Sequence, residues 1–148
     1  MALIDQINAD IKAAMLARDK EKLEVIRDIK SKLMLEATAG TGEVTDEAGA
    51  RIVLKLYKQR MDTYELYVKE GREDLASVEK FQAGIIKVYM PEMMSEDEIK
   101  VEAEAAIAAV GATGPQDMGK VMGMLSGKLA GKADGKVIAD TVKGLLIK

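Results

Sequence analysis

Apolar side chains recur every three or four residues through most of the chain, which is the spacing of amphipathic helices. The first such stretch runs from about Leu3 to Arg18, and the second ends before a glycine-containing loop. A third stretch starts after Thr45 and continues to Gly71, and a fourth covers about 72–89. The alternating β-branched and aromatic runs typical of strands are missing. The first 90 residues are therefore predicted to form a bundle of three to four helices.

Pro91 interrupts the helical pattern, because proline lacks a backbone N–H and restricts the residue before it. Beyond it, Ser95 and Glu98 have the spacing of a capping box, which predicts the start of a new helix. Gly111 is well placed to end that helix. We therefore place a domain boundary at the proline.

Two further helices are predicted after this one. Pro115 is suited to the first position of the next helix, and Asp134 is suited to cap the last one. We therefore expect an all-α protein of two small helical bundles. An N-terminal bundle occupies 1–90, and a C-terminal three-helix bundle occupies 92–148.

Glycine recurs at four-residue intervals after Pro115, at Gly119, Gly123 and Gly127. Four residues are close to one helical turn, so the three glycines share one face of the predicted helix. Each glycine inside a helix costs about 1 kcal/mol relative to alanine. Two explanations are open: a neighbouring helix packs tightly here, or a bulky partner approaches the backbone.

Lysines accompany the glycines, and 111–148 contains six lysines and three acids, although the net charge of the whole chain is −3. A solvated helix face is the plain explanation of these lysines, and a phosphate-binding surface is the other. This region has no arginine or aromatic residue to read or stack bases. An RNA partner would then be recognised by its backbone and shape. The predicted RNA-binding residues are Lys120, Lys128, Lys132 and Lys136.

The chain contains no histidine and no cysteine, which excludes Ser-His-Asp and Cys-His catalysis and the usual zinc sites. Ser95 is better explained as a helix cap than as a nucleophile. The acids at 96–98 suit the first turn of a helix and lack the ligand spacing of a calcium loop. We therefore predict no catalytic residue, no metal and no cofactor.

Hydropathy predicts no contact with membranes. Charges begin at Asp5, so the N-terminal stretch resembles neither a signal peptide nor an anchor. No stretch approaches the roughly 18 apolar residues of a membrane span. We expect a cytoplasmic protein.

Met118 and Met122 fit the core of an aromatic-poor bundle, and an adaptable partner surface is the alternative.

Several segments resemble a known family. The segments 117–123 (DMGKVMG) and 129–136 (LAGKADGK) look like the GatB/YqeY signature. This is the tail domain shared by the B subunit of glutamyl/aspartyl-tRNA amidotransferase and by stand-alone YqeY-like proteins. Upstream, 58–62 (KQRMD), 71–75 (GREDL) and 89–91 (YMP) are also similar to the YqeY-like pattern.

The resemblance implies an all-helical protein of two bundles, whose C-terminal domain is of the type that helps the amidotransferase hold tRNA. It also implies carbon–nitrogen ligase activity with glutamine as amide donor, although the amidase subunit and the phosphorylating domain are not in these residues. We therefore predict a tRNA-associated accessory module of translation without catalysis of its own. A module that docks an amidotransferase or an aminoacyl-tRNA synthetase is the alternative, and the inherited ligase activity is the third hypothesis.

Overall fold

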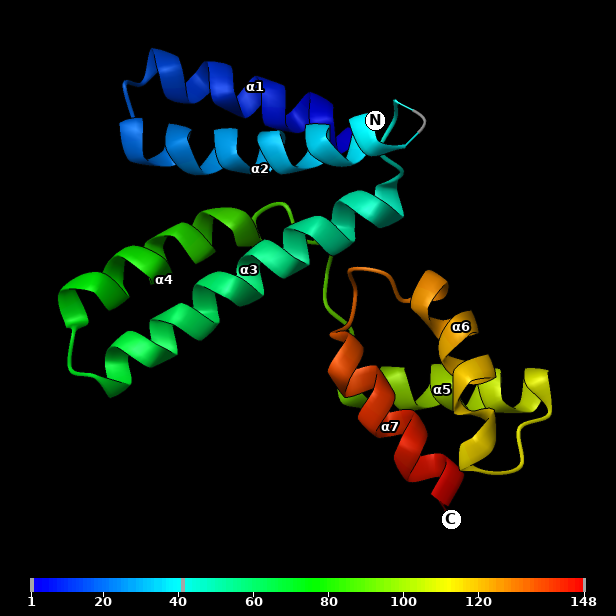
Figure 1. Cartoon of the computed structure of the whole chain (residues 1–148). Coiled ribbons are helices and arrows are strands. Elements are labelled where there is room, and N and C mark those ends of the chain that lie inside the picture. Colours follow the sequence, from blue (N-terminus) through cyan, green and yellow to red (C-terminus); the bar gives the residue numbers. More distant parts are fainter. Residues whose placement is uncertain (1, 41, 148) are drawn as a thin grey trace. The chain divides into compact units, whose positions relative to one another are not determined.

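The computed structural model describes residues 2–40 and 42–147, and Figure 1 shows their arrangement. Within these residues all regular structure is helical, which confirms the all-α prediction. The chain forms two compact units, Met1–Met90 (unit 1) and Pro91–Lys148 (unit 2). The elements are α1 (Ala2–Leu16), α2 (Lys20–Ala39), α3 (Asp46–Lys69), α4 (Glu73–Lys87), α5 (Glu96–Val110), the 3-10 turn η1 (Pro115–Asp117), α6 (Met118–Lys128) and α7 (Gly135–Ile147).

Unit 1 consists of two antiparallel helix pairs, α1 with α2 and α3 with α4 (Figure 1). Aliphatic side chains from all four helices fill one core, and the fully buried ones include Ile7, Ile26, Ile29, Leu33, Val53 and Ile86. Tyr89 closes this core just before Pro91, and its hydroxyl donates a hydrogen bond to the Asp10 carboxylate at 2.5 Å.

Arg60 of α3 connects three helices of unit 1. Its guanidinium lies 3.9 Å from the Asp28 carboxylate of α2 and 3.8 Å from the Glu79 carboxylate of α4. The Glu79 side chain is only 17% exposed, so it depends on this cation for charge compensation. The arrangement places one cation of α3 between acids of α2 and α4.

Unit 2 is a three-helix bundle in which α5, α6 and α7 all contact one another. Its core is aliphatic and contains Ile99, Ala103, Val121, Leu125, Leu129, Ile138, Val142 and Leu146. Met118 and Met122 are half-buried and pack against this core, as the core-filling explanation predicted.

Local capping sets several of the helix ends. Ser95 and Glu98 form the reciprocal capping box at the start of α5, and Gly111 ends that helix in the left-handed conformation with a φ of 66°. The Asp134 carboxylate accepts a hydrogen bond from the backbone N–H of Lys136 at 3.1 Å, at the start of α7. The first helix is shorter than predicted: it ends at Leu16 rather than Arg18.

Candidate nucleic-acid interface

The outer face of α6 is built from glycine. Val121 and Leu125 are buried on the inner side of this helix. The four-residue spacing places Gly119, Gly123 and Gly127 on the other side. The first two are exposed and the third is half-buried. The three residues are called the glycine face below.

Tight helix packing does not explain the glycine face. A Cβ atom added at Gly119, Gly123 or Gly127 would meet no atom within 4 Å outside its own helix backbone. A glycine that lets two helices approach closely would place a neighbour in that space. Within the described residues, the packing explanation of these glycines is therefore wrong, and the face is open backbone.

Lys120 directly follows Gly119 of the glycine face, and its side chain is exposed. Asp117 lies three residues before it, and the Asp117 carboxylate accepts hydrogen bonds from the backbone N–H and hydroxyl of Thr113 at 2.9 and 3.4 Å. The backbone hydrogen bond is the main reason that the pKa of Asp117 is lowered, and the positive charge of Lys120 contributes. The carboxylate therefore stays ionised beside the lysine.

Lys128 belongs to an ion pair within the bundle. Its ammonium lies 2.6 Å from a carboxylate oxygen of Glu102 on α5, and that carboxylate is largely shielded from water. The charge of Lys128 is therefore compensated locally and adds little to the positive potential around α6. Sequence reasoning missed Glu102, because the two residues lie on different helices and no local spacing relates them.

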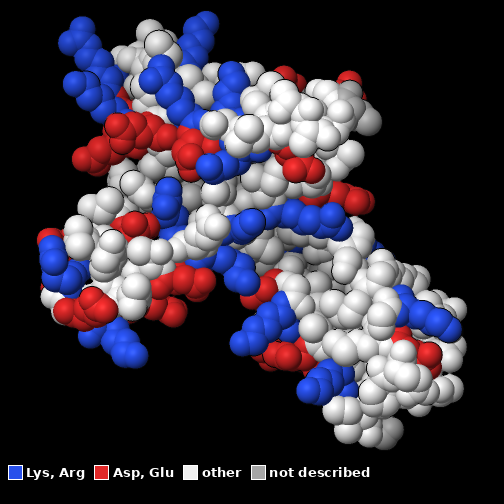
Figure 2. All heavy atoms as spheres, in the orientation of Figure 1, with Lys and Arg blue, Asp and Glu red and all other residues white. Residues whose placement is uncertain are grey.

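The other two predicted lysines lie outside α6. Lys132 is exposed in the segment between α6 and α7, where its backbone carbonyl accepts a hydrogen bond from the Met94 N–H at 2.8 Å. Lys136 is exposed in the first turn of α7. The four predicted lysines thus come from three successive segments. Figure 2 shows basic and acidic atoms interspersed over the visible face of unit 2, without a single continuous basic patch.

Residues 2–40 and 42–147 contain neither a cluster of metal ligands nor a helix suited to span a membrane. No group of three or more acidic side chains lies close enough together to hold a metal ion there. None of the helices in this part of the chain has the length and apolar content that a bilayer span requires.

The family described as Yqey-like protein matches residues 4–146, almost the whole chain. The chain belongs to this family. Its members share the domain with the C-terminal tail of the amidotransferase B subunit, as the motifs around the glycine face indicated. The segments that carried the resemblance extend across both units, in agreement with the length of the match.

The curated relatives include fungal proteins named "Altered inheritance of mitochondria protein 41, mitochondrial". The protein from Clavispora lusitaniae is 32% identical over 101 residues, covering 67% of this chain and 59% of the relative. The protein from Saccharomyces cerevisiae (strain RM11-1a) is 29% identical over 102 residues, covering 68% and 55%. This chain therefore matches less than two thirds of the length of either relative.

The names of these relatives correct one prediction. We expected a cytoplasmic protein, whereas the relatives are mitochondrial by name, and the cytoplasmic prediction is therefore wrong. The reasoning failed because the prediction rested on hydropathy and charge near the start of the sequence, which bear on secretion and membrane insertion. These features do not distinguish the cytosol from an organelle.

Proposed function

We propose that this protein is an accessory module that binds folded tRNA through unit 2 and has no catalytic activity of its own. The observation that carries the proposal is the open glycine face of α6, with Lys120 beside it. Three glycines in one short helix reduce its stability by about 1 kcal/mol each. Packing within the described structure does not explain why glycine is used at these positions. A partner that comes close to the helix backbone does explain it, because any larger side chain would keep that partner away.

The residues of unit 2 define how RNA would be bound. This unit contains no arginine and no aromatic side chain, so it cannot form bidentate contacts with guanine or stack unpaired bases. Lysine ammonium groups act as point charges on phosphates, and Lys120, Lys132 and Lys136 are exposed for this role. Lys128 contributes less because Glu102 compensates its charge. Recognition therefore follows the contour of the folded RNA.

Family membership supports the same proposal, since the related tail domain occurs in an enzyme that acts on tRNA. The affinity is expected to be weak, because the net charge of the chain is −3 and α5 places five acids beside the other two helices of unit 2. Weak electrostatic binding gives a strong dependence on salt.

The test is a filter-binding titration of unfractionated tRNA at two salt concentrations. Three phosphate contacts give a log–log slope of about −2, at roughly −0.7 per contact for single-strand-like scaling. Replacing Lys120, Lys132 and Lys136 together with alanine should remove the salt-dependent binding. The matched control replaces three exposed lysines of unit 1 with alanine, namely Lys12, Lys20 and Lys69. Absent or salt-insensitive binding, or an equal loss in the control, would refute the proposal.

A protein-docking role is the second candidate, and one observation favours it: Met124 of α6 is 44% exposed, on the surface of the same helix. Methionine is common at surfaces that accept partner helices. The Gly123→Leu variant separates the two functions, because a bulky side chain fills the glycine face. Weakened tRNA binding supports the RNA role. Intact tRNA binding with loss of a protein partner supports docking.

A further inference from the structure

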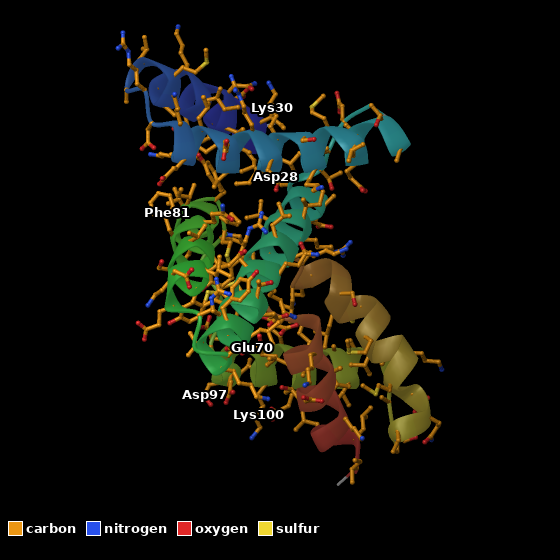
Figure 3. All side chains as sticks on the ribbon, turned by 60° about the vertical axis from the view of Figure 1, so that its left-hand side comes forward. Asp28, Lys30, Glu70, Phe81, Asp97 and Lys100 are labelled. Carbon is orange, nitrogen blue, oxygen red and sulfur yellow. The ribbon has the colours of Figure 1, made fainter. Side chains whose placement is uncertain are left out.

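Helix α4 has a second apolar side that the core of unit 1 does not use. Ala76, Ala83 and Ile86 are buried. Val78, Phe81 and Val88 are 50%, 47% and 66% exposed, and they recur at intervals of three and seven residues. Val88 directly follows the last residue of α4 and keeps the right-handed helical conformation, so this spacing places the three residues on one side of the helix and its cap. Figure 3 shows Phe81 on the side of α4 that points away from α3.

This apolar side forms one wall of a groove. Two hollows of about 340 and 610 Å³ adjoin at Phe81 and lie between α4 and the α1–α2 pair. Val78 lines the first hollow, and Ile85 and Val88 line the second. From 78 to 88 the wall extends about 15 Å along the helix axis. A groove of this length and lining can accept three turns of an apolar helix face.

The opposite rim is mainly acidic. The charged groups that line the two hollows are four carboxylates and two ammonium groups: Asp10, Asp19, Glu21, Glu24, Lys22 and Lys80. The ammonium of Lys80 lies 5.6 Å from the centre of the Tyr64 ring on α3, where a cation–π contact holds it. Asp10 accepts the hydrogen bond of Tyr89. The uncompensated charge of the rim is therefore negative.

Glu21 and Glu24 are the acids best placed to meet a partner. Both are exposed, and they lie three residues apart in the first turns of α2. Residues at this separation are neighbours on a helix surface, so the two carboxylates face the first hollow together.

We propose that this groove binds an amphipathic helix whose apolar side covers Val78, Phe81 and Val88 and whose edge carries lysine or arginine opposite Glu21 and Glu24. Burial of the exposed valines and phenylalanine provides the driving force. The acidic rim selects the basic edge and sets the orientation of the helix. This surface lies in unit 1 and is independent of the glycine face in unit 2.

The probe is a fluorescent peptide of about 18 residues built from leucine, alanine and lysine, with leucine at helical positions i, i+3, i+4 and i+7. One control peptide carries glutamate in place of every lysine. A second keeps the lysines and scrambles the leucines. Fluorescence anisotropy with the full chain should show binding of the probe that is at least about tenfold tighter than that of either control.

Protein variants locate the binding site. Phe81→Ala and Val88→Ser should each weaken probe binding, and the Glu21→Lys, Glu24→Lys double variant should weaken it by about tenfold. The matched controls are Leu66→Ala on α3 and the Glu65→Lys, Glu104→Lys double variant, which make the same kinds of change at exposed positions elsewhere. Circular dichroism establishes that each variant is folded, and Val88→Ser keeps the test valid should Phe81→Ala unfold.

Three results would overturn the proposal. The glutamate or scrambled peptide could bind as tightly as the probe. The groove variants could bind as the parent does. Sedimentation could show a dimer of the parent chain that Val88→Ser dissociates, in which case a second copy covers the groove. Each result leaves the tRNA titration of unit 2 unaffected, so the two proposals fail separately.

Discussion

Gly123→Ala should stabilise unit 2. Gly123 lies in the interior of α6, and an added methyl group would meet no atom within 4 Å beyond its own helix backbone. Its φ is not positive, so alanine can adopt the native backbone conformation. Replacing a helical glycine with alanine then gains about 1 kcal/mol, mainly because the unfolded chain loses conformational freedom. In a unit of this size the midpoint of thermal unfolding rises by about 4–8 °C.

The composition of the chain makes this gain measurable. All four tyrosines and the single phenylalanine lie in unit 1, and the chain has no tryptophan. Tyrosine fluorescence therefore reports on unit 1 alone, whereas circular dichroism at 222 nm reports on the helices of both units. We expect Gly123→Ala to shift the circular dichroism transition of unit 2 and to leave the fluorescence transition unchanged.

Gly111 provides the matched control. It has a φ of 66° at the end of α5, where an added Cβ also meets open space. Alanine in this left-handed conformation costs about 1–2 kcal/mol, so Gly111→Ala should destabilise unit 2. The same substitution is thus expected to stabilise unit 2 at Gly123 and to destabilise it at Gly111, although neither position is crowded. Destabilisation by Gly123→Ala would show that the glycine face is packed against something in solution, and the argument for an open docking surface would be lost.

Three other predictions concern side-chain contacts. Ser95→Ala removes the capping box of α5 and should lower the free energy of unfolding of unit 2 by about 1 kcal/mol, measured by chemical denaturation. Arg60→Met leaves the shielded Glu79 carboxylate without its cation and should lower the free energy of unfolding of unit 1 by about 1–3 kcal/mol. A second change, Glu79→Gln, should restore this free energy if the loss comes from the unpaired charge, and should not restore it if the loss comes from packing. Burial and the hydrogen bond to Asp10 raise the pKa of Tyr89, so its contribution to stability is present below about pH 10 and is lost as pH rises through the folded pKa. Tyr89→Phe should lack this part of the alkaline decline in unfolding free energy.

Helix existence and most helix ends could be predicted because they depend on neighbours in sequence. The capping box at Ser95 and the left-handed Gly111 are both local features. The end of α1 was predicted two residues too late, because Arg18 is a good helix former and no glycine or proline marks the position. Arg18 nevertheless has a φ of 57°. The short turn before α2 imposes this conformation, and no pattern in the residues shows it.

The state of the glycine face could not be predicted from spacing. The period of four places three glycines on one side of a helix whether that side is buried or exposed. Only the positions of Val121 and Leu125 in the core decide which side faces outward. The long-range pairs could not be predicted either, because no local spacing relates their members. Tyr89 and Asp10, for example, lie 79 residues apart along the chain.

Charge counting along the sequence does not show which lysines of unit 2 are compensated by acids. The count of six lysines against three acids in 111–148 omits α5, which contacts both α6 and α7 and carries five acids and one lysine. Three of these acids stabilise the first turn of α5, and Glu102, further along the helix, compensates Lys128. The lysines left to attract a polyanion are therefore those distant from this pair. If the proposed tRNA role is right, a protein with this balance would not bind RNA by charge alone, and close approach to the backbone at Gly119 and Gly123 would supply part of the affinity. For this reason Gly123→Leu is a more decisive variant for tRNA binding than the loss of any single lysine.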